Sequence, residues 1–161
     1  FTFELLHLIL KWNQSDWSLM PINNVKYGSN FKYVEPVNLY DCEIEDDVFV
    51  GPFVEIQNNV KIGSGTRVQS HSFICSQVVI GNDCFIGHGV MFVNDKFANG
   101  EVNFDPPFED TIIGNNVLIG SNATILPVSI CDDVIIGAGS VVTKDITKPG
   151  VYVGNPAKKI K

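Results

Sequence analysis

The feature that most constrains this 161-residue chain is an aliphatic or aromatic residue that recurs at every sixth position. A period held over so many units indicates a solenoid. Because six is out of phase with the 3.6-residue turn of a helix, no helix could bury this pattern. The first run comprises Ile44, Val50, Ile56, Ile62, Val68, Ile74, Ile80, Ile86 and Phe92; the period returns at Ile113, Ile119 and Ile125, and in a shifted phase at Ile130, Ile136 and Val142.

The rest of the repeat predicts a short strand followed by a corner. Glycine often follows the aliphatic residue, and Asn, Asp or Ser often comes next, as in Ile80-Gly81-Asn82-Asp83. These residues tolerate the positive φ angles of tight turns. Four positions after the aliphatic residue comes a small or β-branched one, such as Val54, Thr66 or Cys84. We therefore expect an all-β solenoid whose narrow interior holds one large and one small side chain per unit.

Composition favours one compact cytoplasmic domain, and the formal charge of -7 argues against nucleic acid as a partner. The apolar run Phe1–Leu10 is too short to span a bilayer and lacks the features of a signal peptide, so we predict no membrane partner. The four cysteines show no metal-binding spacing and are interpreted as reduced, packed thiols: Cys42, Cys75, Cys84 and Cys131.

Two interruptions break the period. Five residues replace six between Ile125 and Ile130, which predicts a tightened corner. The larger interruption, residues 95–111, is rich in Pro, Gly, Asn and acidic residues and is expected to project from the solenoid; we call it the excursion. A loop this long inside a regular stack is usually functional or disordered, and its aromatic and Pro-Pro elements favour order.

Residues 22 to 160 resemble the hexapeptide-repeat transferases. The resemblance implies a left-handed parallel β-helix with three six-residue units per triangular coil. The left hand comes from the family alone, since parallel crossovers usually prefer the right hand. The expected organisation is an N-terminal extension at residues 1–21 and a β-helix at 22–161 that includes the excursion and a short C-terminal tail.

The segment Phe92-Val93-Asn94-Asp95 resembles that of bacterial nucleotide-sugar N-acetyltransferases, which acylate a 3-amino sugar and carry Phe-x-Asn-Asp before a protruding loop. The resemblance implies a homotrimer with acetyl-CoA between neighbouring subunits and the nucleotide sugar near this element. Asn94 and Asp95 would then lie at the reacting centre. We further expect the substrate to contact Lys96, Phe108 and Glu109, and the product to serve surface-polysaccharide synthesis.

The residue types favour an amine as the acetyl acceptor. An alcohol must lose its proton to attack a thioester, and relatives that acetylate hydroxyl groups carry a His at the start of the equivalent loop. No His lies between Phe92 and Thr111, whereas a neutral amine already has a lone pair. His88 falls at an outward corner beside the excursion; it is a candidate general base, a ligand for a sugar hydroxyl, or a surface histidine.

The C-terminal part suggests where the coenzyme would bind. Five of the eleven Lys and Arg residues lie here, and the family places coenzyme A phosphates beside the Gly-Asn-Pro-Ala segment, which is Gly154–Ala157 in this chain. A solvated tail is the alternative interpretation. The predicted coenzyme contacts are Gly120 and Ala138 for the pantetheine arm, and Lys144, Lys158 and Lys159 for the phosphates.

Three other functions stay open. One is O-acetylation of a sugar or small alcohol, and another is a noncatalytic β-helix scaffold. The third is a γ-type carbonic anhydrase, which shares the fold but binds zinc through three histidines. Only His71 and His88 lie within the repeats, so we predict no metal site.

Overall fold

The structure is a computed structural model that describes residues 21–97, 100–102 and 108–161. Within these residues every regular element is a short strand, and the strands form three sheets. Sheet A contains β1 (Ile22–Asn23), β4 (Asn38–Tyr40), β7 (Glu55–Ile56), β10 (Phe73–Ile74), β13 (Met91–Phe92), β16 (Thr124–Ile125) and β19 (Val141–Val142).

The other two sheets complete the coil. Sheet B contains β2 (Lys26–Tyr27), β5 (Glu43–Ile44), β8 (Lys61–Ile62), β11 (Val78–Ile80), β14 (Thr111–Ile113) and β17 (Ser129–Ile130). Sheet C contains β3 (Lys32–Tyr33), β6 (Phe49–Val50), β9 (Arg67–Val68), β12 (Phe85–Ile86), β15 (Leu118–Ile119), β18 (Val134–Ile136), β20 (Gly150–Val153) and β21 (Lys158–Lys159).

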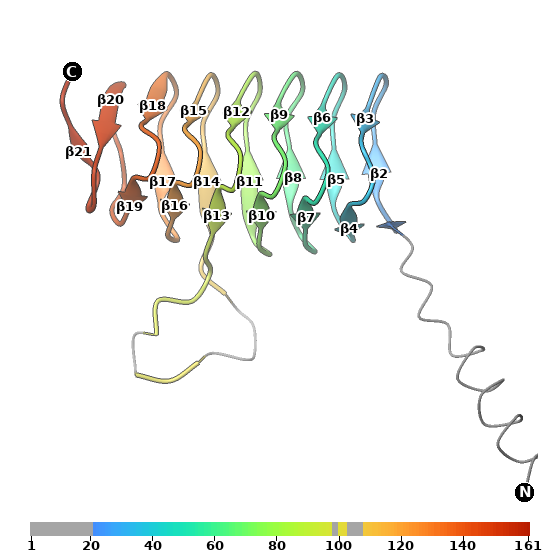
Figure 1. The fold of residues 1–161 in the computed structure, drawn as a ribbon, viewed down its shortest axis with the longest axis horizontal. Coiled ribbons are helices and arrows are strands. Elements are labelled where there is room, and N and C mark those ends of the chain that lie inside the picture. The colour runs from blue at the N-terminus through green and yellow to red at the C-terminus, as the bar shows by residue number, and fades with distance from the viewer. Residues whose placement is uncertain (1–20, 98–99, 103–107) are drawn as a thin grey trace, which may run out of the picture.

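Successive strands enter sheets A, B and C in turn, so the chain winds into a three-sided prism (Figure 1). Equivalent residues of adjacent coils pair in parallel, as Ile56 does with Ile74 and Ile62 does with Ile80. These partners are eighteen residues apart, which means that three six-residue units make one coil. The predicted all-β, left-handed parallel β-helix is confirmed.

The interior is a stack of like side chains. The sixth-position residues from Ile44 to Phe92 are all buried, and so are the small residues four places after those from Ile44 to Ile86, including Val54 and Cys84. Ala123, four places after Ile119, is buried as well. Removal of this apolar surface from water is the main stabilising force, at about 25 cal/mol per Å². Buried hydroxyls are satisfied by the neighbouring coil: Thr66 Oγ1 donates to the Gly81 carbonyl at 2.9 Å, and Ser72 Oγ donates to that of Gly87 at 2.8 Å.

The corners carry the turn residues that the sequence predicts. Asn59, Asp83 and Asn116 adopt left-handed φ angles of 59°, 54° and 55°. Asn and Asp tolerate this region because their short polar side chains hydrogen-bond locally. Some of these side chains also join coils, since Asn115 Oδ1 accepts from the backbone N–H of Asn82 at 2.9 Å.

The excursion leaves the corner between sheets A and B, after β13, and returns at β14 (Figure 1). One coil later, the short corner between β16 and β17 buries Pro127 and Val128. At the C-terminal end, β21 pairs antiparallel with β20 and closes the prism. No helix among the described residues is long and apolar enough to cross a membrane.

Candidate functional site

Two edges of the prism border sheet A, and all the predicted catalytic residues lie on them. We call the corners between sheets C and A the C–A edge, which contains Ser70–His71, Gly87–Gly89, Gly120–Asn122 and Gly137–Gly139. The corners between sheets A and B form the A–B edge, which contains Asn58–Asn59, Ser76–Gln77 and Asn94–Asp95.

His88 lies exposed on the C–A edge, as predicted from its position in the repeat. Its Nδ1 lies 2.8 Å from Ser70 Oγ, one coil earlier. The backbone also holds this corner, because the His88 carbonyl accepts from Asn122 N–H at 2.8 Å. With Nδ1 occupied, Nε2 is the ring nitrogen that remains for proton transfer or hydrogen bonding.

His71 follows Ser70 on the C–A edge, one coil before His88. Its ring stacks on Phe53, with the centroids 4.9 Å apart, and both residues adopt left-handed φ angles. The part of the chain that the structure describes contains no group of three His, Cys, Asp or Glu residues able to hold a metal ion. A three-histidine zinc site of the carbonic anhydrase kind is therefore not present in those residues.

Asn94 and Asp95 lie at the root of the excursion on the A–B edge, both half-buried. Asn94 Nδ2 donates to Ser76 Oγ at 3.0 Å, and Asp95 Oδ1 accepts from the Phe97 N–H at 2.8 Å. These bonds fix the direction in which the chain leaves the coil. They also leave the side-chain carbonyl oxygen of Asn94 available to a ligand.

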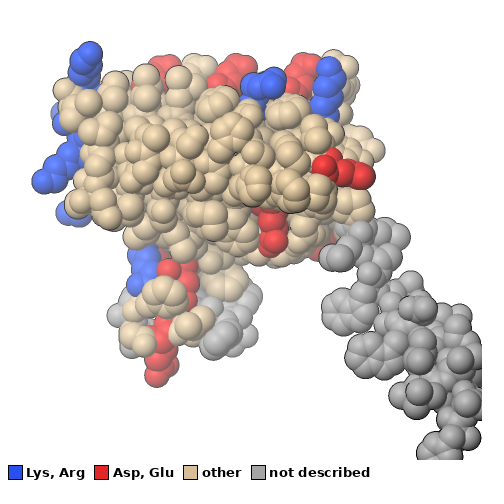
Figure 2. All heavy atoms as spheres, viewed as in Figure 1, with Lys and Arg blue, Asp and Glu red and all other residues tan. Residues whose placement is uncertain are grey.

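An ion pair links the two legs of the excursion. The Lys96 ammonium contacts the Glu109 carboxylate, and Phe108 beside it is half-buried. The predicted substrate contacts Lys96, Phe108 and Glu109 therefore lie together at the base of the excursion. Figure 2 shows basic and acidic side chains beside each other below the body of the prism, where the excursion projects.

The structure does not bring His88 together with Asn94 and Asp95 within one chain. Strand β13 crosses sheet A between them, so they lie at opposite borders of that sheet. One small reacting group cannot touch both edges of the same prism. A site that uses both needs His88 of one copy beside Asn94 of another, or else uses only one of them.

The predicted coenzyme contacts fall into two groups. Gly120 and Ala138 lie on the C–A edge with His88, and a Cβ on Gly120 would stand only 2.5 Å from the Ala138 nitrogen. At this point of the edge, backbone therefore lies directly against backbone. The lysines all lie towards the C-terminal end, where Figure 2 shows a group of basic side chains, but on different sides: Lys144 follows β19 at the A–B edge, whereas Lys158 and Lys159 form β21 of sheet C.

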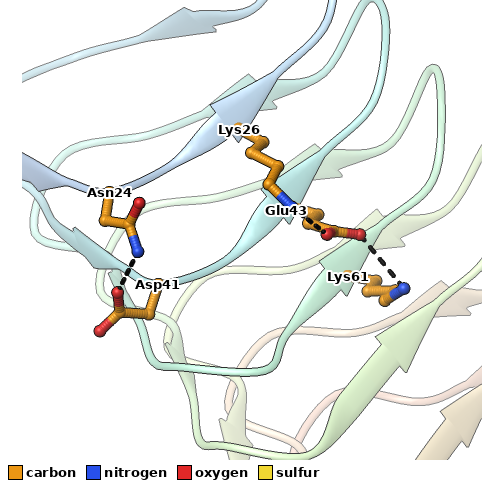
Figure 3. A network of polar contacts seen from close by, with 5 residues as sticks. All are labelled: Asn24, Lys26, Asp41, Glu43 and Lys61. Atoms are coloured by element: carbon orange, nitrogen blue, oxygen red, sulfur yellow. Dashed lines mark hydrogen bonds and ion pairs between the residues drawn. The ribbon is translucent and has the colours of Figure 1, made fainter.

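A groove of about 540 Å³ lies over sheet B, away from the C–A edge. Within it the Glu43 carboxylate binds Lys26 at 3.0 Å and Lys61 at 3.1 Å (Figure 3). Hydrogen bonds from these two lysines lower the pKa of Glu43. None of the predicted catalytic residues lines the groove, and its ion pairs are exposed, so we assign it no chemistry.

The cysteines have the character of core residues rather than nucleophiles. Burial raises the pKa of Cys42 to about 11 and that of Cys75 to about 12, and it also raises that of Cys84. A nucleophilic cysteine needs the opposite shift, towards the thiolate.

The sequence interpretation missed two serines that hold the candidate residues. Ser70 contacts His88, and Ser76 contacts Asn94, each across eighteen residues. That separation is one full coil. Once three units per coil are assumed, a search eighteen residues upstream of each candidate would have found both.

Comparison with family models places repeats over most of the β-helix. Residues 41–76 match the bacterial transferase hexapeptide (six repeats), and residues 77–91 and 110–144 match the hexapeptide repeat of succinyl-transferase. Together these matches span more than half of the chain.

Curated relatives match shorter stretches. Identity is 45% over 65 residues with a chloramphenicol acetyltransferase of Agrobacterium fabrum, covering 40% of this chain and 29% of the relative. Identity is 48% over 64 residues with the galactoside O-acetyltransferase of Escherichia coli, covering 39% of this chain and 30% of the relative. The chain thus spans about three-tenths of the length of these relatives.

Solved structures match over nearly the whole chain. AntD, an N-acyltransferase from Bacillus cereus in complex with dTDP and coenzyme A, aligns with a TM-score of 0.64 and 22% identity, covering 100% of this chain and 89% of that one. Perosamine N-acetyltransferase from Caulobacter crescentus, in complex with CoA and GDP-perosamine, aligns with a TM-score of 0.61 and 20% identity. The alignment covers 98% of this chain and 65% of that one. At these identities the likeness shows a common fold.

Proposed function

The chain belongs to the hexapeptide-repeat transferase family, and from that premise we propose that it is an acetyl-CoA-dependent N-acetyltransferase. The proposed acceptor is the amino group of a nucleotide-linked amino sugar. The observation that carries the proposal is the state of Asn94 at the root of the excursion. Its side-chain nitrogen is held by Ser76, its side-chain oxygen is available, and no histidine follows before Thr111.

The reaction requires little from the protein beyond positioning. The neutral amine attacks the thioester carbonyl carbon, the C–S bond breaks, and coenzyme A leaves as a thiolate that takes up a proton. The nitrogen loses its surplus proton after the attack, so a strong base is not needed before it. Asn94 would orient the amine, and Asp95 would favour a group that arrives as an ammonium ion. Backbone N–H groups at the corners would stabilise the developing oxyanion.

Acetyl-CoA is proposed to lie along the C–A edge. The close approach of Gly120 to Ala138 leaves backbone free of side chains for an extended pantetheine arm, and Lys158 and Lys159 of the adjoining sheet C are available for phosphate groups, whereas Lys144 lies at the other edge. Two solved relatives support this choice of ligands, since AntD was crystallised with dTDP and coenzyme A, and perosamine N-acetyltransferase with CoA and GDP-perosamine.

A homotrimer would reconcile the two edges. Coenzyme on the C–A edge and acceptor at the A–B edge cannot react within one prism, because sheet A lies between them. In a closed ring of three copies, each C–A edge can face the excursion of a neighbour. Sedimentation or light scattering tests this arrangement: a fully active monomer at assay concentration would contradict it.

O-acetylation is the second candidate, and one contact favours it. His88 is exposed and tethered through Nδ1 to Ser70, which suits a general base for a hydroxyl group. The matched stretch of the galactoside O-acetyltransferase supports the same alternative.

The deciding experiment measures release of free thiol from acetyl-CoA. The acceptors are 3-amino and 4-amino nucleotide sugars, each paired with the corresponding hydroxy sugar. We expect turnover of an amine and none of its hydroxy counterpart. Turnover of hydroxy sugars alone would favour O-acetylation. Absence of both turnover and acetyl-CoA binding would favour the scaffold interpretation.

A further inference from the structure

A chain of polar contacts crosses three coils of the A–B edge and ends at Asn94. Gln57 Nε2 donates to the Glu55 carboxylate at 2.9 Å, and Gln57 Oε1 accepts from the backbone N–H of Ser76 at 3.2 Å. Ser76 Oγ then accepts from Asn94 Nδ2 at 3.0 Å. Ser76 is buried, with 4% of its surface exposed, whereas the other three side chains are half-buried.

The direction of the first two bonds is fixed by chemistry. A backbone N–H can only donate and an ionised carboxylate can only accept, so Gln57 must turn its oxygen to Ser76 and its nitrogen to Glu55. This hydrogen bond ties the Ser76 backbone to the preceding coil. The buried hydroxyl therefore stands at a defined place beneath the root of the excursion.

We infer that Ser76 is a positioning residue that turns the Asn94 amide so that its Oδ1 points away from the coil and accepts an N–H of the acetyl acceptor. Gln57 and Glu55 anchor Ser76. The inference rests on the proposed function, and it concerns how the same site distinguishes nitrogen from oxygen.

An amide oxygen suits an amine better than an alcohol as the acceptor. A neutral primary amine can donate one N–H to Asn94 Oδ1 while its lone pair attacks the thioester, and it loses a proton only afterwards. A hydroxyl group has a single proton and must give it up to a base as it attacks. An amide oxygen accepts a hydrogen bond but does not take the proton. An Asn94 held in this orientation therefore favours amine acceptors over hydroxyl acceptors.

The test uses Ser76→Ala, Ser76→Thr and Gln57→Leu, with Asn58→Ala as the matched control. Asn58 lies on the same edge one coil before Ser76 and takes no part in the chain of contacts. The substrate-independent readout is NMR of the Asn94 side-chain amide in the whole protein, assigned with Asn94→Ala. We expect Ser76→Ala to accelerate hydrogen exchange of the Asn94 amide about tenfold or more, and Ser76→Thr, which keeps the hydroxyl, to restore it.

The kinetic readout is the ratio of amine to hydroxyl turnover, measured with the acetyl-CoA KM as an internal control. We expect Ser76→Ala to lower kcat/KM for the amine about tenfold and to reduce that ratio, with the acetyl-CoA KM unchanged. Gln57→Leu should act in the same direction but less, which covers the case in which Ser76→Ala does not fold. Asn58→Ala should match the wild type in both readouts.

Unchanged exchange at Asn94 in both Ser76→Ala and Gln57→Leu would overturn the inference. So would an equal effect of Asn58→Ala, since that would indicate a general loosening of the edge. If the wild-type protein acetylates no amine, the proposed function fails, while the exchange measurement still decides whether Ser76 orients Asn94.

Discussion

The two edges that border sheet A are built from the same six-residue unit, yet they differ in the residues at their corners and in whether the excursion interrupts them. On the C–A edge, glycine corners lie against one another, and backbone hydrogen bonds run on from coil to coil, as from Gly89 to Ser70 at 3.0 Å and from Asn122 to His88 at 2.8 Å. On the A–B edge the corners carry polar side chains, and the stack opens after Asn94 into the excursion.

The difference suggests a division of tasks within one repeat. Where its corners are Gly or Ala, as at Gly120 and Ala138, a continuous edge can accept a long, extended ligand along its backbone. An interrupted edge instead supplies side chains that the preceding coil can hold in one orientation, as Ser76 holds Asn94. Three predictions test this division and a fourth concerns the interior; they follow in order of decreasing effect.

Asn94→Ala should have the largest effect, on turnover rather than on folding. Loss of a single positioned polar group in a reacting centre commonly costs about 10²- to 10³-fold in rate. We expect a loss of this order in kcat/KM for an amine acceptor, with the urea midpoint close to that of the wild type because Asn94 is only half-buried. Asn58→Ala is the control. Wild-type rates in Asn94→Ala would remove the A–B edge from the mechanism.

Gly120→Ala should destabilise the continuous edge. The added Cβ would stand 2.5 Å from the Ala138 nitrogen, and backbone at that distance can give way only by shifting a coil. Overpacking of this kind costs about 1–3 kcal/mol. Urea unfolding measures the free energy, and isothermal titration measures the expected loss of acetyl-CoA affinity. Ser121→Ala, at the next position, is the control; equal midpoints for the two variants would contradict the proposed close packing.

His88→Asn distinguishes the two acceptors. If the acceptor is an amine, we expect less than a tenfold loss and a rate that still rises with pH as the substrate ammonium deprotonates. Removal of a general base for a hydroxyl acceptor would cost about 10²- to 10⁴-fold instead. Ser70→Ala, which frees Nδ1, should follow His88→Asn in direction. If the wild-type protein turns over hydroxy sugars and His88→Asn loses that activity, the C–A edge has a catalytic role.

The smallest effect concerns the thiols of the interior, which both edges enclose. The folded state raises the pKa of Cys42 to about 11 and that of Cys75 to about 12, above the ordinary value of 9.0. At pH values between 9.0 and these raised pKa values, the folded protein therefore keeps thiol protons that the unfolded chain has lost. Their contribution to stability is complete below pH 9 and declines as the pH rises to 11–12.

Urea midpoints at pH 8 and pH 10 measure this decline. We expect the midpoint to fall between the two values, and the fall to be smaller in Cys75→Ala, which has one titrating thiol fewer. An identical fall in the variant would mean that Cys75 does not contribute. Native Cys42 and Cys75 should also react slowly with thiol reagents at pH 8, so they should not disturb the thiol-release assay.

Much of the fold could be predicted from the period alone. The sixth-position residues, the small residues four places later, the Asn and Asp corners and the outward position of His88 all follow from where each residue stands in its unit. The excursion could also be predicted, because residues 95–111 break the pattern between β13 and β14. A residue's place within a unit decides whether it faces inward or outward, and that is local information.

Which residues meet on an edge is not local, and only the tertiary structure decided it. The coil length sets the partners of His88 and Asn94, because three units per coil align positions eighteen residues apart. The excursion then breaks that count, so that Asn122 lies against His88 although 34 residues separate them in the sequence. The sequence by itself determined the unit and its inward face. The stacking of units into coils determined that His88 and Asn94, six residues apart, lie on different edges of the prism.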